Sequence, residues 1–259
     1  MAGESKAGFF AAARELLDRL SSTQDEALEA ASRICADAIA AGGLVHAFGT
    51  GHSRIPVEEL FPRYGSYPGF NPLVELSMTF HTQVVGSNGQ RQAMFIERVE
   101  GLAAQILANF DLGPPDALLV FSAGGLTAVP IEMAIGARER GLRVVAVTSV
   151  ANANASPPSH STGTRLLDHA DVVVDLCTPP GDALVRLEGV ETPVAPGSSL
   201  AAVAVANEIK TRTAALLAAR GALPPVLTSA AVVGAERSAA LFDAAYAEHA
   251  RRARRALRT

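Results

Sequence analysis

The first forty residues carry apolar side chains at helical spacing. In residues 9–40 they recur every three or four positions, as in FFAAARELLDRL, and this periodicity predicts two amphipathic helices. Ser22 and Thr23, with Glu26 three residues after Thr23, have the pattern of a capping box, which places the start of the second helix there. Two glycines at positions 42 and 43 are expected to end this helix.

From residue 43 the pattern changes to short, unbroken apolar runs, each followed by small residues and then a helical stretch. Runs that do not alternate with polar residues predict strands buried on both faces. Strands that alternate with helices favour a parallel sheet covered by helices on both sides. The expected strands are GLVHAFG at 43–49, DALLVFS at 116–122, LRVVAVTS at 142–149 and ADVVVDL at 170–176, with PLVEL at 72–76 as a further short strand.

Helical stretches separate these runs and continue beyond them. They are expected at about 54–64, 90–110, 127–140 and 160–169, with a long alanine-rich helix at 199–220 and another from about 235. Neither an internal repeat nor a long linker interrupts the pattern. We expect N-terminal helices over residues 1–42, a central α/β domain over 43–225 and a C-terminal helical extension over 226–259.

Composition narrows the class of protein. With 49% hydrophobic and 19% charged residues among 259, the chain has globular composition, and its net charge of −4 provides no field that would attract nucleic acid. The arginines of the C-terminal ARRARRALRT are interpreted as a solvated helix end. Apolar runs of transmembrane length and a leader pattern are both missing, so we expect a cytoplasmic protein without a membrane partner. Cys35 and Cys177 lack metal-ligand spacing and are expected to be buried thiols.

The first predicted strand ends in GTGHS at 49–53, a loop with three candidate uses. Glycines let backbone N–H groups approach an anion, and hydroxyls and a following helix start add further favourable contacts. A dinucleotide site would need G-x-G-x-x-G, and here Arg54 occupies the third glycine position. A phosphate site and a simple tight turn remain as the other two interpretations.

The second predicted strand ends in a loop of the same kind, FSAGGLT at 121–127. Because ligands of parallel sheets bind beyond the carboxyl ends of the strands, two such loops favour an anion held between them. Thr148 and Ser149 repeat the hydroxyl pattern after the third strand.

At this point the chain resembles the sugar isomerase (SIS) domain. GTGHS and FSAGGLT are similar to the two phosphate-binding loops of that family, of which the second usually reads Ser-x-Ser-Gly-x-Thr. Gly124 stands here in place of the second serine. The stretches GHSRIPVEELF, PIEMA, SHSTGTRL and HADVVVD add a resemblance to uncharacterised SIS proteins related to phosphoheptose isomerase, over about residues 20–225.

The resemblance implies a fold and a binding site. The fold is a three-layer αβα sandwich around a five-stranded parallel sheet, flavodoxin-like, with extra helices at both termini. The ligand is a sugar phosphate, held by hydroxyls and backbone amides and not by a lysine. The binding residues implied are Thr50, Gly51, His52, Ser53, Ser122, Gly124, Gly125 and Thr127.

Aldose–ketose isomerisation needs a base that moves a proton between C1 and C2. Glu59 resembles the second glutamate of the AEEL stretch that supplies the base in phosphoheptose isomerases, although its spacing from the serine is about one helical turn shorter. Its neighbour Glu58 is a second candidate, and His81 is a candidate acid–base group. The late helix contains VANEIKTRT, without the second catalytic histidine of those enzymes. We expect no metal, because no Cys/His cluster appears, and no cofactor.

Three functions follow from these residues. The chain is a phosphosugar isomerase or a related lyase or etherase, a phosphosugar sensor without catalysis, or an NAD-binding protein. No basic recognition helix supports a role in binding nucleic acid. Apolar faces on the N-terminal helices and small residues on 199–220 favour a homodimer or homotetramer.

Overall fold

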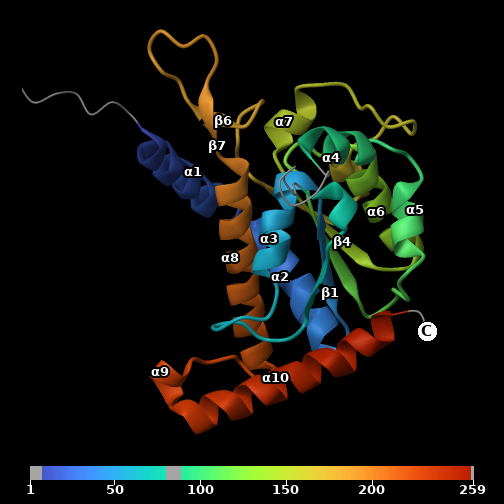
Figure 1. Ribbon diagram of the computed structural model, residues 1–259, viewed down its shortest axis with the longest axis vertical. Coiled ribbons are helices and arrows are strands. Elements are labelled where there is room, and N and C mark those ends of the chain that lie inside the picture. The colour runs from blue at the N-terminus through green and yellow to red at the C-terminus, as the bar shows by residue number, and fades with distance from the viewer. Residues whose placement is uncertain (1–7, 80–88, 258–259) are drawn as a thin grey trace, which may run out of the picture.

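A five-stranded parallel sheet forms the centre of the computed structural model, which describes residues 8–79 and 89–257 (Figure 1). The strand order β2-β1-β3-β4-β5 is that of flavodoxin-like folds. The strands are β1 (Val45–Gly49), β2 (Phe70–Leu73), β3 (Ala117–Phe121), β4 (Arg143–Thr148) and β5 (Val172–Asp175). The α/β class and the parallel five-stranded sheet predicted from the sequence are therefore confirmed.

The central strands are buried on both faces, as their unbroken apolar runs predict. Every residue of β1 and β3 is buried, whereas the edge strands β2 and β5 are only partly covered. Successive side chains point to opposite faces of a sheet. Val45 and Ala47 of β1 thus face one hydrophobic cluster, and Phe48 faces the other.

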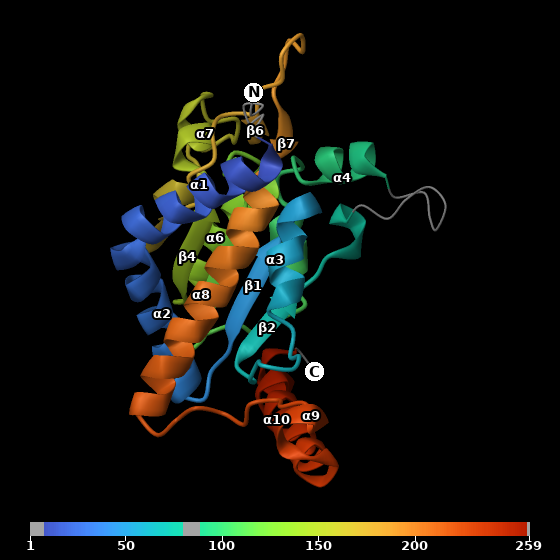
Figure 2. The ribbon, with the colours of Figure 1, turned by 90° about the vertical axis from the view of Figure 1, so that its left-hand side faces the viewer.

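Helices cover both faces of the sheet. One cluster joins the sheet to α1, α2, α3 and α8, and the other joins it to α5 and α6. Figure 2 looks onto the first face, where α8 lies between α2 and α3. The α-helices are α1 (Phe9–Thr23), α2 (Asp25–Ala40), α3 (Arg54–Glu59), α4 (Gln90–Ile96), α5 (Leu102–Leu107), α6 (Ala128–Glu139), α7 (Val150–Asn154), α8 (Ser198–Ala219), α9 (Ala230–Val233) and α10 (Ala235–Ala256), and the 3-10 turns are η1 (Gly51–Ser53), η2 (Leu76–Met78) and η3 (Leu166–His169).

The predicted capping box at the start of the second helix is wrong. Ser22 and Thr23 lie in the last turn of α1, where their hydroxyls donate to the carbonyls of Asp18 and Arg19. Gln24 occupies the N-cap of α2 without a side-chain cap bond. Serine and threonine hydroxyls bind either a following N–H or a preceding carbonyl, and here the preceding helix takes them.

Three other predicted helices differ from the structure. The stretch 160–169 is a turn followed by η3, because the side chains of His160, Thr162 and Thr164 hydrogen-bond to one another. The stretch 90–110 is divided into α4 and α5 by Gly101, whose φ is +89°. The helix expected over 54–64 ends at Glu59.

The C-terminal helix α10 crosses the end of the sheet away from the carboxyl ends of the strands (Figure 1). Arg252 is 6% exposed and donates to the carbonyls of Ile39 and Gly43, at 2.8 and 2.7 Å. Arg255 donates to the carbonyl of Gly42. The interpretation of this arginine cluster as a solvated helix end is therefore wrong for Arg252, which satisfies carbonyls at the end of α2.

The segment between β5 and α8, residues 176–197, forms a projecting ribbon (Figure 1). It carries the antiparallel pair β6 (Ala183–Val185) and β7 (Val194–Pro196). Cys177, Asp182 and Ala195 have positive φ angles of 56°, 68° and 67°. No helix within residues 8–79 and 89–257 has both the length and the apolar character needed to cross a bilayer.

Candidate functional site

A cavity of about 420 Å³ opens beyond the carboxyl ends of β1 and β3. Both glycine-rich loops contribute to its wall, together with residues from α4, the ribbon and the start of α8. The structure thus brings together all the binding residues implied by the sequence: Thr50, Gly51, His52, Ser53, Ser122, Gly124, Gly125 and Thr127.

The first loop is folded tightly enough to require glycine. A Cβ at Gly49 would lie 2.2 Å from the carbonyl oxygen of Ser53, and Gly51 has a φ of +55°. The N–H of Ser53 donates to the carbonyl of Thr50 at 2.9 Å and closes the turn. The same compact turn places the Ser53 and Thr50 side chains at the wall of the cavity.

The second loop is closed by its own serine. The N–H of Gly125 donates to Ser122 Oγ at 3.1 Å, and Gly125 has a φ of +62°. A Cβ at Gly125 would lie 2.9 Å from Oγ1 of Thr148, which is fully buried. Thr127 occupies the N-cap of α6, but its hydroxyl does not make the usual cap hydrogen bond. The loop therefore leads directly into a helix N-terminus, where partial positive charge favours an anion.

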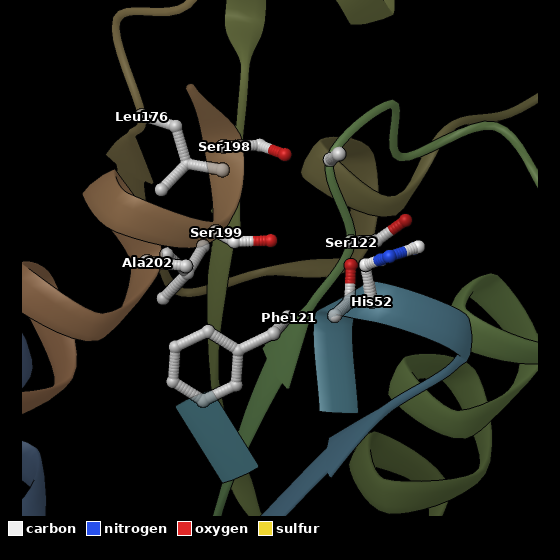
Figure 3. A pocket seen from close by; sticks show the side chains of 10 residues that line it. His52, Phe121, Ser122, Leu176, Ser198, Ser199 and Ala202 are labelled. Atoms are coloured by element: carbon white, nitrogen blue, oxygen red, sulfur yellow. The ribbon is translucent and has the colours of Figure 1, made fainter. Parts of the chain in front are cut away.

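The start of α8 adds two hydroxyls that the sequence analysis missed. Figure 3 shows Ser198 and Ser199 across the pocket from His52 and Ser122. A signal was present, since Gly197-Ser198-Ser199 repeats the pattern of small, hydroxyl-bearing residues before a helix. Thr148 and Ser149, which the sequence did single out, are fully buried, and Ser149 Oγ donates to the carbonyl of Thr178.

Two carboxylates lie in the wall of this cavity, Glu97 and Asp182. Asp182 accepts hydrogen bonds from the N–H of Ser198 at 2.7 Å, from Ser198 Oγ at 2.6 Å and from the N–H of Gly197 at 3.2 Å. Asp182 therefore accepts the hydrogen bonds of the N–H groups at the N-terminus of α8. Glu97 follows α4 and accepts a hydrogen bond from Thr50 Oγ1 at 2.6 Å. Burial raises the pKa of the Glu97 carboxyl, and the bond from Thr50 opposes part of that shift.

The carboxylates predicted as catalytic lie elsewhere. Glu59 faces α8, where it accepts from Arg63 at 2.9 Å and from Asn207 at 3.4 Å, and its backbone carbonyl accepts from Lys210. Glu58 is paired with Arg54 on the exposed side of α3. Neither residue belongs to the cavity wall described above. His81 lies outside the described residues. The catalytic roles of Glu59, Glu58 and His81 stay predictions.

Two further histidines, His46 and His160, are held by neighbouring polar side chains. His46 in β1 is buried, and its ring nitrogens lie 3.3 Å from Asp116 and 3.0 Å from Asn71, so it is a hydrogen-bonded core residue. His160 lies with Glu132 and Glu100 in a group whose ligand atoms fall within 4.8 Å of one another, as a metal site would need.

The side chains of this cluster already make hydrogen bonds within the protein. Glu132 accepts from the N–H of Gly101 at 2.8 Å, and Glu100 accepts from the N–H of Ser161 at 2.8 Å. His160 contacts Thr162 Oγ1 at 2.8 Å through its other ring nitrogen. These bonds fix the loop after α7 against α5 and α6, which accounts for the cluster without an ion.

Comparison with known proteins places the chain in a family. The sequence profile of the SIS domain matches residues 8–149. A UPF0309 protein of Streptomyces coelicolor is 38% identical over 226 residues, covering 87% of this chain and 88% of the relative. A UPF0309 protein of Geobacillus kaustophilus is 31% identical over 228 residues, covering 88% of each chain.

A solved structure shares the fold. The phosphoheptose isomerase of Francisella tularensis superposes with a TM-score of 0.50 at 14% identity, over 79% of this chain and 94% of that one. At this identity the likeness establishes the architecture alone. With the profile match and the UPF0309 relatives, it shows that the chain belongs to the SIS domain family.

Proposed function

We propose that this protein binds a sugar phosphate in the cavity between its two glycine-rich loops and catalyses aldose–ketose isomerisation of it. The observation that carries the proposal is the convergence of both loops on one cavity at the carboxyl edge of the sheet. Neither lysine nor arginine belongs to the described wall, so backbone N–H groups, hydroxyls and the α6 dipole would hold the phosphate.

The position of the phosphate follows from the two helix starts at the cavity. Asp182 already supplies a carboxylate to the N-terminus of α8. The N-terminus of α6, behind Ser122 and Thr127, has no such acidic residue in its first turn. The phosphate would therefore lie against the second loop, with the sugar extending toward α4 and the first loop.

Membership of the SIS family and the fold shared with an enzyme named phosphoheptose isomerase support the chemistry. Glu59, Glu58 and His81 remain the catalytic residues predicted from the sequence. Assembly into a homodimer or homotetramer and the division at residues 42 and 225 likewise remain predictions. Binding without turnover is an outcome that the experiments below distinguish from catalysis, whereas a related lyase reaction would begin with the same removal of a proton from carbon.

The binding site is tested by removing two hydroxyls together. We expect Ser122→Ala with Thr127→Ala to weaken sugar-phosphate binding at least tenfold, because two hydrogen bonds to a charged group are lost. Calorimetric titration with fructose 6-phosphate, glucose 6-phosphate, ribose 5-phosphate and N-acetylglucosamine 6-phosphate measures this.

A matched control removes two exposed helical hydroxyls far along the chain from these loops, Ser21→Ala with Thr211→Ala, and should leave affinity unchanged. Melting curves without ligand establish that both double variants are folded. If the cavity variant binds as tightly as the wild type, the phosphate site lies elsewhere.

A further inference from the structure

Glu97 is held between the two loops that form the proposed site. Its side chain accepts the hydrogen bond from Thr50 Oγ1 in the first loop, at 2.6 Å. Its backbone carbonyl accepts from the N–H of Val129, in the first turn of the helix that follows the second loop, at 3.0 Å. Both contacts fix this carboxylate relative to the loops, although it comes from a third segment of the chain.

Glu97 has an oxygen that can accept a further hydrogen bond, which the other carboxylate in the wall, Asp182, lacks. The two oxygens of Asp182 accept hydrogen bonds from Gly197 and Ser198, which start α8. In Glu97, Oε2 binds Thr50, while Oε1 is paired only loosely with Arg98 at 3.9 Å. Among the described residues of the cavity wall, Glu97 is thus the carboxylate with an oxygen left for a ligand.

The surroundings of Glu97 suit proton transfer. The side chain is 17% exposed, and burial raises the pKa of its carboxyl above the ordinary value of 4.5. A carboxylate that accepts protons from carbon is more effective when its pKa lies closer to the working pH. Met94 precedes Glu97 by three residues and also lines the cavity, so the end of α4 covers the same space.

We infer that Glu97 is the catalytic base that moves the proton between C1 and C2 of the bound sugar phosphate. This inference rests on the proposed function of the cavity. For an open-chain aldose, Glu97 takes the hydrogen of C2 as a proton, and the C–H electron pair becomes the C1=C2 bond of an enediol while the carbonyl oxygen O1 gains a proton. Return of the first proton to C1 and loss of the O2 proton give the ketose.

The test follows deuterium exchange at carbon by NMR in D2O, with fructose 6-phosphate and the three other sugar phosphates named above as probes. Exchange detects removal of the proton whether isomerisation or elimination follows. Glu97→Gln keeps an oxygen that accepts from Thr50 but removes the base, and we expect exchange at least 100-fold slower with affinity within threefold of wild type.

Two further variants sharpen the test. Glu139→Gln removes an exposed carboxylate at the end of α6 and should exchange at the wild-type rate. Glu59→Gln tests the competing assignment, in which the base is the glutamate predicted from the sequence.

The pH dependence of exchange gives a separate test. The rate of exchange by the wild type should rise with pH through a pKa above 4.5, since only the ionised carboxylate of Glu97 accepts the proton.

The outcomes separate the inference from the function beneath it. Exchange by Glu97→Gln within threefold of wild type overturns the role of Glu97, as does a large loss in Glu59→Gln alone. A wild type that binds a probe but exchanges no deuterium overturns the catalytic role and leaves binding intact. A wild type that binds no probe overturns both. An equal loss of affinity and exchange in Glu97→Gln also overturns the assignment, because it indicates a binding role.

Discussion

Gly124 is the residue at which the second loop departs from the usual SIS pattern, Ser-x-Ser-Gly-x-Thr. It lies in the cavity wall, and its backbone is outside the left-handed region that favours glycine, unlike that of Gly125. An added Cβ would meet only the amide nitrogen of the Asn152 side chain, at 3.0 Å. A serine is therefore compatible with the loop after a small movement of Asn152.

We expect Gly124→Ser to bind sugar phosphate at least about tenfold more tightly, since one hydrogen bond to a charged group contributes about 1.5 kcal/mol or more. Calorimetry on the probe that binds wild type best measures the change. Gly124→Ala is the matched control, because it adds the same Cβ without the hydroxyl. Serine and alanine variants of equal affinity would show that the absent hydroxyl does not limit binding.

At this scale the sequence predicted the loops but not the carboxylate beside them. Glycines and hydroxyls form a local pattern, and Thr50, Ser53, Ser122 and Thr127 follow directly from it. Glu97 lies 47 residues after Thr50 in a stretch, ERVEG, that has no motif of its own. Its place in the cavity depends on how α4 packs against the first loop, and no local pattern encodes that packing.

Among elements, the ribbon between β5 and α8 combines strained backbone with contacts to the cavity. Asp182 and Pro196 line the cavity from this ribbon, and Asp182 has a positive φ. Ala195, beside Pro196 in β7, has a φ of +67°. Left-handed backbone costs a residue with a Cβ about 1–2 kcal/mol, and glycine avoids this cost.

Ala195→Gly is therefore expected to stabilise the protein by about 1 kcal/mol, after allowance for the greater flexibility of glycine in the unfolded chain. For a chain of this size that corresponds to about 2 °C in Tm, measurable by calorimetry. The same substitution at Ala215, exposed within α8, should destabilise by about 1 kcal/mol. Loss of stability at both positions would show that Ala195 is not strained in solution.

Strands were the most predictable elements and helix ends the least. The apolar runs identified β1, β3, β4 and β5 because both faces of a central parallel strand must be apolar. Helix ends depend on which partner a hydroxyl finds, as the alternative bonding of Ser22 and Thr23 shows. The loop at 160–165 depends on contacts with residues such as Glu132, and those contacts arise only when the chain is folded.

For the molecule as a whole, the N-terminal helix leaves apolar surface open. Phe10 is 77% exposed and Leu17 is 37% exposed, and a groove of about 290 Å³ runs between α1, α2 and α8. Exposed apolar surface of this kind favours association between copies of the chain.

We expect light scattering at micromolar concentration to give a homodimer or homotetramer. Phe10→Ser with Leu17→Ser should shift the protein toward monomer, because both changes remove apolar area from α1. Val232→Ser, at a residue 76% exposed on α9, is the control and should leave the mass unchanged. A monomeric wild type would contradict the prediction.

The contact of Arg252 with the end of α2 has a consequence for synthesis. The carbonyl of Gly43 and its partner Arg252 are 209 residues apart in the chain. At about 10 residues per second, a ribosome needs about 20 s to add those residues. Throughout that interval water must solvate the carbonyl of Gly43, whereas the carbonyl of Ile39 can already accept from the N–H of Gly42. The last helix can therefore dock only after the ribosome has made every described residue of the cavity wall, the last of which is Ser199.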